Sequence, residues 1–517
     1  MAGLTLEEFL RGLGPGLSPE NIFARLMEQT LQEAEPALAE AFLMCAVPHR
    51  FDAPLLAALN GGTEEAAEGL IRQMSALSFV YLAPDGRRYY HENARAYLLA
   101  RAREDAARFR DWSARAADFY EKQLGMKAFF AKRMGPRQAE LTPEEMDLYV
   151  EVIYHRLAVD DEAAFPLFEQ AFWDAEFDWR LAVCHTLVAS VREQAAVLTG
   201  DRALWLRYYE GRLIEAAQRW AEATEVLEPL LHEELSPKLR SWLTNSLALV
   251  YYSQGRWGEA LAQYEASLKI ERELGDRAGE ATTLNNIGNV YDAQGRWGEA
   301  LAQHEASLQI VRELGDRAGE AGTLSNIGNV YDAQGRWGEA LAQFEASLKI
   351  VRALGDRAGE AQTLNNIGNV YYSQGRLDEA IACYQQSLAI KRELGDLDGE
   401  TSSLNNIAES LKKKGQWEEA IRYYEDALKI ARAMNNRVKE ARRLGGLADV
   451  FKETGEWGKA EEYYRQAVEI LRETEDREQL GEWLAELSEL YRMQHRWEEA
   501  VRCIEEALGI WRQALSS

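Results

Sequence analysis

A forty-residue repeat governs what this chain can fold into. The stretch from Asn285 to Tyr291 returns at 325–331 and 365–371, and it fades at 405–408. A fixed period of this length is typical of a stacked array, in which each unit buries its apolar face against its neighbours. Two frames keep the same period, a glycine frame and an aromatic frame. They are Gly255, Gly295, Gly335, Gly375, Gly415 and Gly455, and Trp257, Trp297, Trp337, Trp417, Trp457 and Trp497.

Each unit is predicted to form two helices. In residues 276–315, Asp276 is a helix N-cap, and Leu284, Ile287 and Tyr291 then share one helical face. Gly295 ends this helix and Trp297 opens the second one. The small residues on the facing sides allow the two helices to approach closely. The tryptophans are expected to pack against their own repeat.

The pattern resembles the tetratricopeptide repeat. The residues at that family's signature positions are Leu284, Ile287, Gly288, Tyr291, Ala300 and His304. The period is forty rather than thirty-four residues, which is similar to the repeats of kinesin light chains. The resemblance implies an all-α fold, a right-handed α-solenoid with seven repeats in 237–517. A degenerate repeat is expected at 199–236, and a helical linker with irregular repeats at 104–198.

The first hundred residues follow a different pattern. An N-terminal helix and linker are expected at 1–17, and helices, a hairpin and a further helix at 18–103. Pro84-Asp85-Gly86 is the hairpin signal between two short apolar and aromatic runs. The segment resembles the winged-helix module that follows the nucleotide-binding domain of STAND signalling ATPases. No phosphate-binding loop motif occurs in the sequence, so the resemblance does not extend to the ATPase domain of those proteins.

Composition and motifs argue against several classes of function. The net charge of -26 disfavours nucleic acid and anionic membranes, which need a basic footprint. Four well-separated cysteines are typical of a reducing cytoplasm, and no apolar run is long enough to span a membrane. No zinc-protease or serine-hydrolase motif occurs, so we expect no enzyme, no catalytic residue, no metal site and no cofactor. His304 is expected to be a core residue.

Asparagines form the candidate site. Asparagine is a mediocre helix former, yet it recurs at the positions of the first helix that face away from the partner helix. A primary amide offers both donors and an acceptor, so a ladder of amides can bind the backbone of an extended chain. The alternative is hydrogen bonding between repeats. The candidates are Asn285, Asn286, Asn289, Asn326, Asn329, Asn365, Asn366, Asn369, Asn405 and Asn406.

Differences between units show where the array varies. Residues 280–319 and 320–359 differ only at positions 282, 285, 304, 309 and 313 of the first unit and their equivalents. Farther along, position 289 becomes acidic, at Glu409, Asp449 and Glu489, and Lys412 and Arg443 are added nearby. We expect this C-terminal part of the groove to read side chains through its mixed charge.

The leading hypothesis is a non-enzymatic adaptor or sensor. It would bind an extended peptide or protein segment in the concave groove, and a second protein at the winged-helix-like module, within a bacterial signalling, regulatory or defence system. The first alternative is a peptide-sensing transcription regulator with a DNA-binding winged helix. Glu64, Glu65 and Glu68 on the would-be recognition helix oppose contact with phosphate. The second alternative is a scaffold subunit of an enzyme, with no ligand specificity.

Overall fold

The computed structural model describes residues 19–125, 142–177, 181–474 and 476–514. The helix and linker predicted at 1–17 lie outside the described residues. The chain forms two compact units, Met1–Gln254 and Gly255–Ser517, and each is described by itself. Helices dominate both units, and the all-α prediction is confirmed.

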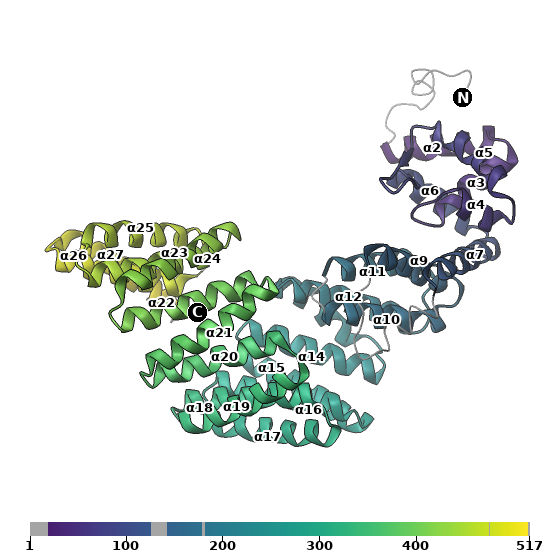
Figure 1. The fold of residues 1–517 in the computed structure, drawn as a ribbon. Coiled ribbons are helices and arrows are strands. Elements are labelled where there is room, and N and C mark those ends of the chain that lie inside the picture. The colour runs from purple at the N-terminus through teal and green to yellow at the C-terminus, as the bar shows by residue number, and fades with distance from the viewer. Residues whose placement is uncertain (1–18, 126–141, 178–180, 475, 515–517) are drawn as a thin grey trace. The chain divides into compact units, whose positions relative to one another are not determined.

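The N-terminal part of the first unit is a helical domain with one hairpin (Figure 1). Its elements are α2 (Pro19–Glu33), α3 (Pro36–Ala46), α4 (Ala53–Asn60), α5 (Glu64–Ser75), β1 (Val80–Leu82), β2 (Arg88–Tyr90), α6 (Glu92–Arg103) and α7 (Ala106–Leu124). The strands are antiparallel, with Val80 opposite Tyr90, and Phe51 forms one further bridge to Arg88. The predicted hairpin and the order of helices around it are confirmed.

The first unit continues as further helices. They are α9 (Pro143–Val159), α10 (Asp161–Phe177), α11 (Leu181–Glu193), α12 (Arg202–Ala216), α13 (Trp220–Leu227) and α14 (Pro237–Ser253), with short 3-10 turns at Ala195–Val197 and Glu228–His232. Val152 and Ala158 of α9 join the same apolar core as Phe42, Met74 and Trp112 of the preceding elements. One continuous core therefore extends past residue 103. The limits 18–103, 104–198 and 199–236 stay predictions.

The second unit is a stack of antiparallel helices in chain order (Figure 1). The first helices of the repeats are α16 (Arg277–Ala293), α18 (Arg317–Ala333), α20 (Arg357–Ser373), α22 (Leu397–Lys413), α24 (Arg437–Glu453) and α26 (Arg477–Met493). The second helices are α15 (Trp257–Leu274), α17 (Trp297–Leu314), α19 (Trp337–Leu354), α21 (Leu377–Leu394), α23 (Trp417–Ala433), α25 (Trp457–Arg472) and α27 (Trp497–Ala514).

The helix ends follow the predicted signals. The carboxylate of Asp276 accepts a hydrogen bond from the backbone N–H of Gly279 at 2.9 Å, and Asp316 and Asp356 repeat this cap. Gly295 has φ of 69°, in the left-handed region where a side chain would be strained. The turns between helices are therefore set locally by each repeat.

Close packing in three of the repeats depends on a glycine of the first helix, at Gly288, Gly328 and Gly368. A Cβ at Gly288 would lie 2.6 Å from the His304 ring, and one at Gly328 would lie 2.7 Å from Phe344. His304 is fully buried, so its predicted core position is confirmed. Ser307, at a position where the family usually has alanine, donates to the Ala281 carbonyl at 2.7 Å. These three repeats thus combine one close contact between their two helices with one buried hydrogen bond.

The tryptophans pack less fully than expected. Trp257, Trp297, Trp337, Trp457 and Trp497 are between 37% and 57% exposed, and only Trp417 is half-buried against the apolar core. Each indole stands at the first residue of a second helix, next to the turn that joins the two helices of its repeat, and is partly accessible to solvent. Within the described ranges, no helix is long and apolar enough to cross a bilayer.

Candidate interaction face

The ten candidate asparagines lie on one side of α16, α18, α20 and α22, which we call the asparagine face. Nine of the side chains are half-exposed and Asn329 is exposed, whereas Leu284 and Ile287 on the opposite side of α16 are 3% exposed. The helical period explains this division, because the two sets of positions alternate around the helix. The face therefore offers amides that solvent or a ligand can reach.

Some of these amides connect neighbouring repeats. Asn326 Nδ2 donates to Asn285 Oδ1 at 3.2 Å, and Asn406 Nδ2 donates to Asn365 Oδ1 at 3.0 Å. Position 325 is serine, and Asn366 instead lies 3.5 Å from Asn329. Arg443 of α24 donates to Asn405 at 2.7 Å. Hydrogen bonding between repeats, the alternative role raised by the sequence, thus occurs at several positions of the ladder.

Other amides have no such role. Among the residues that the structure describes, the side chains of Asn286 and Asn289 make no hydrogen bond to the protein. Both are half-exposed on the same helix. Their donors and acceptors are directed away from the packed side of the repeat, so they remain available to a ligand.

Two carboxylates extend the asparagine face by one helical turn. Asp292 and Asp332 are half-buried, and neither has a cation within ion-pair distance among the described residues. One oxygen of Asp332 is buried without a hydrogen-bond partner. Burial raises the pKa of both carboxyl groups, because the charged form loses hydration. A cationic group placed here would restore that lost stabilisation.

Tyrosines of the second helices bind the side chains at the equivalents of position 289 in three later repeats. Tyr384 donates its hydroxyl to Asn369 at 2.8 Å, and Tyr424 and Tyr464 donate to Glu409 and Asp449. Burial and the neighbouring carboxylate raise the pKa of the Tyr424 hydroxyl, so it remains protonated. In the first two of these repeats the second helix carries His304 or Phe344 and offers no hydroxyl. Among the described residues, a tyrosine of the second helix therefore binds position 289 in three repeats, at Asn369, Glu409 and Asp449.

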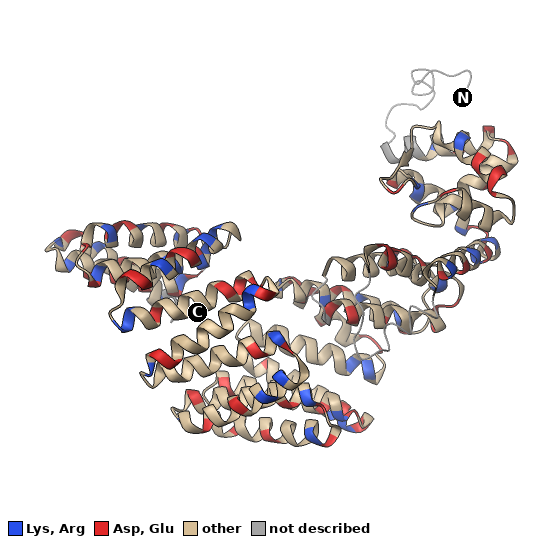
Figure 2. Ribbon diagram, in the orientation of Figure 1, with Lys and Arg blue, Asp and Glu red and all other residues tan. Residues whose placement is uncertain are grey.

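The C-terminal half of this side is charged but internally paired. Figure 2 shows acidic and basic residues interspersed along α22 to α27. Lys412 lies 2.9 Å from Glu409 and 3.0 Å from Asp449, and Lys452 pairs with Glu486. Burial alone would lower the pKa of Lys412, but these carboxylates raise it. The residues line a cavity of about 480 Å³, where the predicted mixed charge is largely neutralised by its own neighbours.

The repeat pattern can be compared with known families at this point. A family model described as tetratricopeptide repeat matches residues 239–313, 319–393, 400–473 and 454–513, which together span about half of the chain. The chain belongs to the tetratricopeptide repeat family. The predicted resemblance is confirmed, and the tetratricopeptide repeats account for every helix pair of the second unit. No curated protein sequence matches the chain.

Solved structures show the same fold at low identity. A Signal Transduction ATPase with Numerous Domains (STAND) protein with a tetratricopeptide repeat sensor, from Pyrococcus horikoshii, has a TM-score of 0.53 and 13% identity over 90% of this chain and 67% of that chain. The apo quorum sensor NprR from B. thuringiensis has a TM-score of 0.50 and 17% identity over 68% of this chain and 100% of that chain. The apo form of RapI has a TM-score of 0.50, with 15% identity over 67% and 97%.

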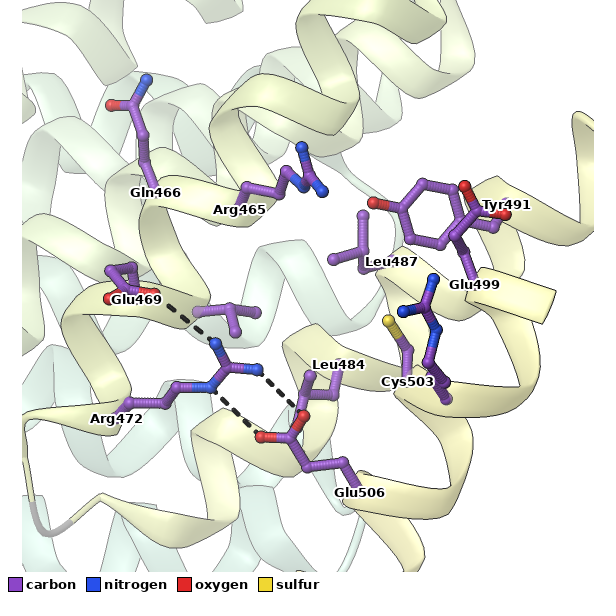
Figure 3. Close-up of a pocket in the computed structure, with 12 residues that line it drawn as sticks. Arg465, Gln466, Glu469, Arg472, Leu484, Leu487, Tyr491, Glu499, Cys503 and Glu506 are labelled. Carbon is purple, nitrogen blue, oxygen red and sulfur yellow. Dashed lines mark hydrogen bonds and ion pairs between the residues drawn. The ribbon is translucent and has the colours of Figure 1, made fainter. Parts of the chain in front are cut away.

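A second cavity in the tetratricopeptide repeats lies among α25, α26 and α27 (Figure 3). It has a volume of about 620 Å³, a floor of Leu484 and Leu487, and a charged rim. Arg472 spans the rim, 2.9 Å from Glu506 and 3.5 Å from Glu469. Burial raises the pKa of the Cys503 thiol, so it stays protonated, and no histidine is among the lining residues. No pattern in the sequence indicated this cavity.

Sequence patterns also did not predict a charged cluster in the first unit. His49, between α3 and α4, lies 3.0 Å from Glu151 of α9 and 3.5 Å from Glu193 of α11. Burial alone would lower the pKa of His49, but the two carboxylates raise it to about 9. Arg95 of α6 also pairs with Glu193, at 2.7 Å. The partners are 98 or more residues apart in sequence, so no local spacing could have indicated them.

Proposed function

We propose that the chain is a protein-interaction component that binds an extended segment of a partner along the asparagine face. One observation carries the proposal. The side chains of Asn286, Asn289, Asp292 and Asp332 share this face of α16 and α18, and none has a polar side-chain partner within the described residues. Polar groups left half-buried in this way gain free energy when a ligand satisfies them.

The carboxylates indicate the chemistry of the segment. Asp292 and Asp332 favour a lysine, an arginine or an N-terminal amine of the partner, since opposite charge compensates for their partial burial. The amides of Asn286 and Asn289 suit the peptide groups on either side. The paired charges of α22 to α26 offer less to a cation, so the basic part of the segment belongs at α16 and α18.

Selection from a random twelve-residue peptide library displayed on phage tests this function. We expect enriched peptides to be basic and to lose about a hundredfold in affinity for the variant Asn286→Ala, Asn289→Ala, Asn329→Ala, at about 1 kcal/mol per hydrogen bond. The variant should keep its melting temperature, because alanine is the better helix former.

A matched control replaces the amides that connect repeats. Asn285→Ala with Asn365→Ala should lower the melting temperature and leave most of the affinity, because these side chains accept bonds from Asn326 and Asn406. The proposal fails if no peptide is enriched, or if the enriched peptides bind the triple variant as tightly as the original chain.

We further propose that the region 18–103 is a winged-helix-like module that binds a second protein, within a bacterial signalling, regulatory or defence system in the cytoplasm. The acidic start of α5, with Glu64, Glu65 and Glu68, supports a protein rather than DNA. Sequence-specific binding of the full chain to duplex DNA in a gel shift at physiological salt would favour the transcription regulator instead.

A further inference from the structure

Two tryptophans of the first unit enclose a lysine ammonium. Trp205 lies on α12 and Trp242 on α14, with their ring centroids 5.4 Å apart and their planes at 84°. The Nζ atom of Lys238, one helical turn before Trp242, lies 5.3 Å from the Trp205 ring centroid and 5.0 Å from that of Trp242. Both distances are within the range of a cation–π contact. One cation therefore lies over two indoles that stand nearly at a right angle.

A carboxylate lies on the same cation. Glu169 of α10 is half-buried, with its Oε1 atom 3.8 Å from Lys238 Nζ. The Tyr209 hydroxyl donates to the same oxygen at 3.2 Å. We call Trp205, Trp242 and Glu169 the indole corner. Its three groups come from three helices of one unit, and Tyr209 fixes the carboxylate independently of the lysine.

Lys238 is a poor match for this environment. An ammonium carries three donors, yet among the residues that the structure describes Lys238 Nζ donates no hydrogen bond to the protein. The side chain is 56% exposed, and its ion pair with Glu169 is long, so the pair contributes little. A quaternary ammonium has no donor to satisfy, and its methyl groups can lie directly on the indole faces. The corner therefore suits a methylated ammonium better than its present occupant.

The packing of the repeats does not require the second indole. None of the six later repeats has a tryptophan at the position of Trp242, where the residues are Thr282, Gly322, Gln362, Ser402, Arg442 and Glu482. No lysine occupies the position of Lys238 in those repeats either. The corner is thus an addition to the repeat pattern, made where α14 meets α10 and α12.

We infer that the indole corner binds a quaternary ammonium group, which displaces Lys238. The two indole faces supply cation–π attraction and Glu169 supplies the opposite charge. Trp205 is only 6% exposed with Lys238 over its ring, so a ligand reaches this face when the lysine leaves. The group can be carried by a trimethylated lysine of a partner protein or by a free ligand of the choline type. The inference does not depend on the function of the asparagine face.

Isothermal titration calorimetry of the full chain tests the site with two matched ligands. Choline carries the cation, and 3,3-dimethylbutan-1-ol has the same shape without the charge. We expect choline to bind about tenfold more tightly than the neutral alcohol, because only the cation is attracted by the rings. A blocked trimethyl-lysine that binds more tightly than choline would indicate a partner protein as the source, and the reverse order would indicate a free ligand.

Variants separate the corner from its occupant. Lys238→Ala should raise the affinity for choline about tenfold, because it removes the competing cation. The control Lys413→Ala removes another lysine whose Nζ lies over a single ring, 4.5 Å from the centroid of Tyr372, and should leave choline binding unchanged. Trp242→Leu keeps an apolar side chain but loses the indole face, and should abolish the preference for choline over the alcohol.

Two results would overturn the inference. One is the absence of choline binding by the Lys238→Ala variant, in which the corner is vacated. The other is equal affinity of that variant for choline and for the neutral alcohol, which would leave only an apolar contact. If Trp242→Leu loses helicity by circular dichroism, the comparison of the two ligands on Lys238→Ala still decides, since that variant keeps all three groups of the corner.

Discussion

The imidazole of His304 donates from Nδ1 to the side-chain oxygen of Asn285, at 2.9 Å across the two helices of one repeat. These are two of the few positions at which residues 280–319 and 320–359 differ. In residues 320–359 the equivalent residues are Phe344 and Ser325. The Ser325 hydroxyl donates to Ser347 Oγ at 2.9 Å. The two substitutions therefore replace one hydrogen bond between the helices of a repeat with another.

The buried imidazole makes stability depend on pH. Burial lowers the pKa of His304 to about 4, from about 6.5 in the unfolded chain. The folded state is therefore favoured fully above pH 6.5, and it loses this contribution as the pH falls from 6.5 through 4. The loss amounts to about 3 kcal/mol when complete. Melting temperatures between pH 7 and 4 should show it.

The near-identical repeat supplies the matched substitution. His304→Phe together with Asn285→Ser copies Phe344 and Ser325, so the new residues are already accommodated by the same backbone. The melting temperature of this variant should fall less between pH 7 and 4 than that of the original chain. Equal falls for both proteins would show that His304 is not responsible.

Two glycines of one repeat should respond to alanine in opposite ways. At Gly328 a Cβ would lie 2.7 Å from Phe344, whereas at Gly338 no atom lies within 4 Å. Both are helical, so alanine gains about 0.5–1 kcal/mol of helix propensity at each. We expect Gly338→Ala to stabilise the chain by that amount, and Gly328→Ala to destabilise it by about 1–3 kcal/mol. Urea unfolding midpoints measure both, and adding Phe344→Leu should rescue Gly328→Ala.

Features that depend only on contacts within one repeat could be predicted from the sequence. Asp276 caps its helix, Gly295 turns the chain and Gly288 admits the second helix, all through contacts within one forty-residue unit. The period itself then requires the units to stack. The ten asparagines could likewise be placed on one side of the first helices, since this follows from the helical period alone.

Contacts between repeats could not be predicted from the sequence. Whether an asparagine binds its neighbour depends on the residue forty positions away, as Asn326 and Asn285 show. The pairing of Lys412 with Asp449 depends in the same way on how two helices are set side by side. Amide and charge patterns indicate which groups are present, but the superhelix decides which of them meet.

An ion pair between the two helices of one repeat can be restored by one substitution. Arg277 lies 3.0 Å from Glu313, and Arg357 lies 2.6 Å from Glu393, but the equivalent partner of Arg317 is Ala353. We expect Ala353→Glu to stabilise the chain by about 0.5 kcal/mol, since such exposed pairs contribute little, and 1 M salt should abolish the gain. An unchanged gain in high salt would instead point to helix propensity.

The hydrogen bond from Tyr384 to Asn369 determines which substitutions can separate ligand binding from stability on the asparagine face. Because Asn369 accepts the hydroxyl at 2.8 Å, Asn369→Ala removes both a candidate ligand group and a structural partner. Tyr384→Phe removes the bond alone and should cost about 1 kcal/mol, and the double variant should cost less than the sum of the two. Asn289→Ala has no such partner and should leave stability unchanged. Guanidinium unfolding of the original chain and these four variants measures the costs. Additive effects of Asn369→Ala and Tyr384→Phe would mean that the bond contributes nothing in solution.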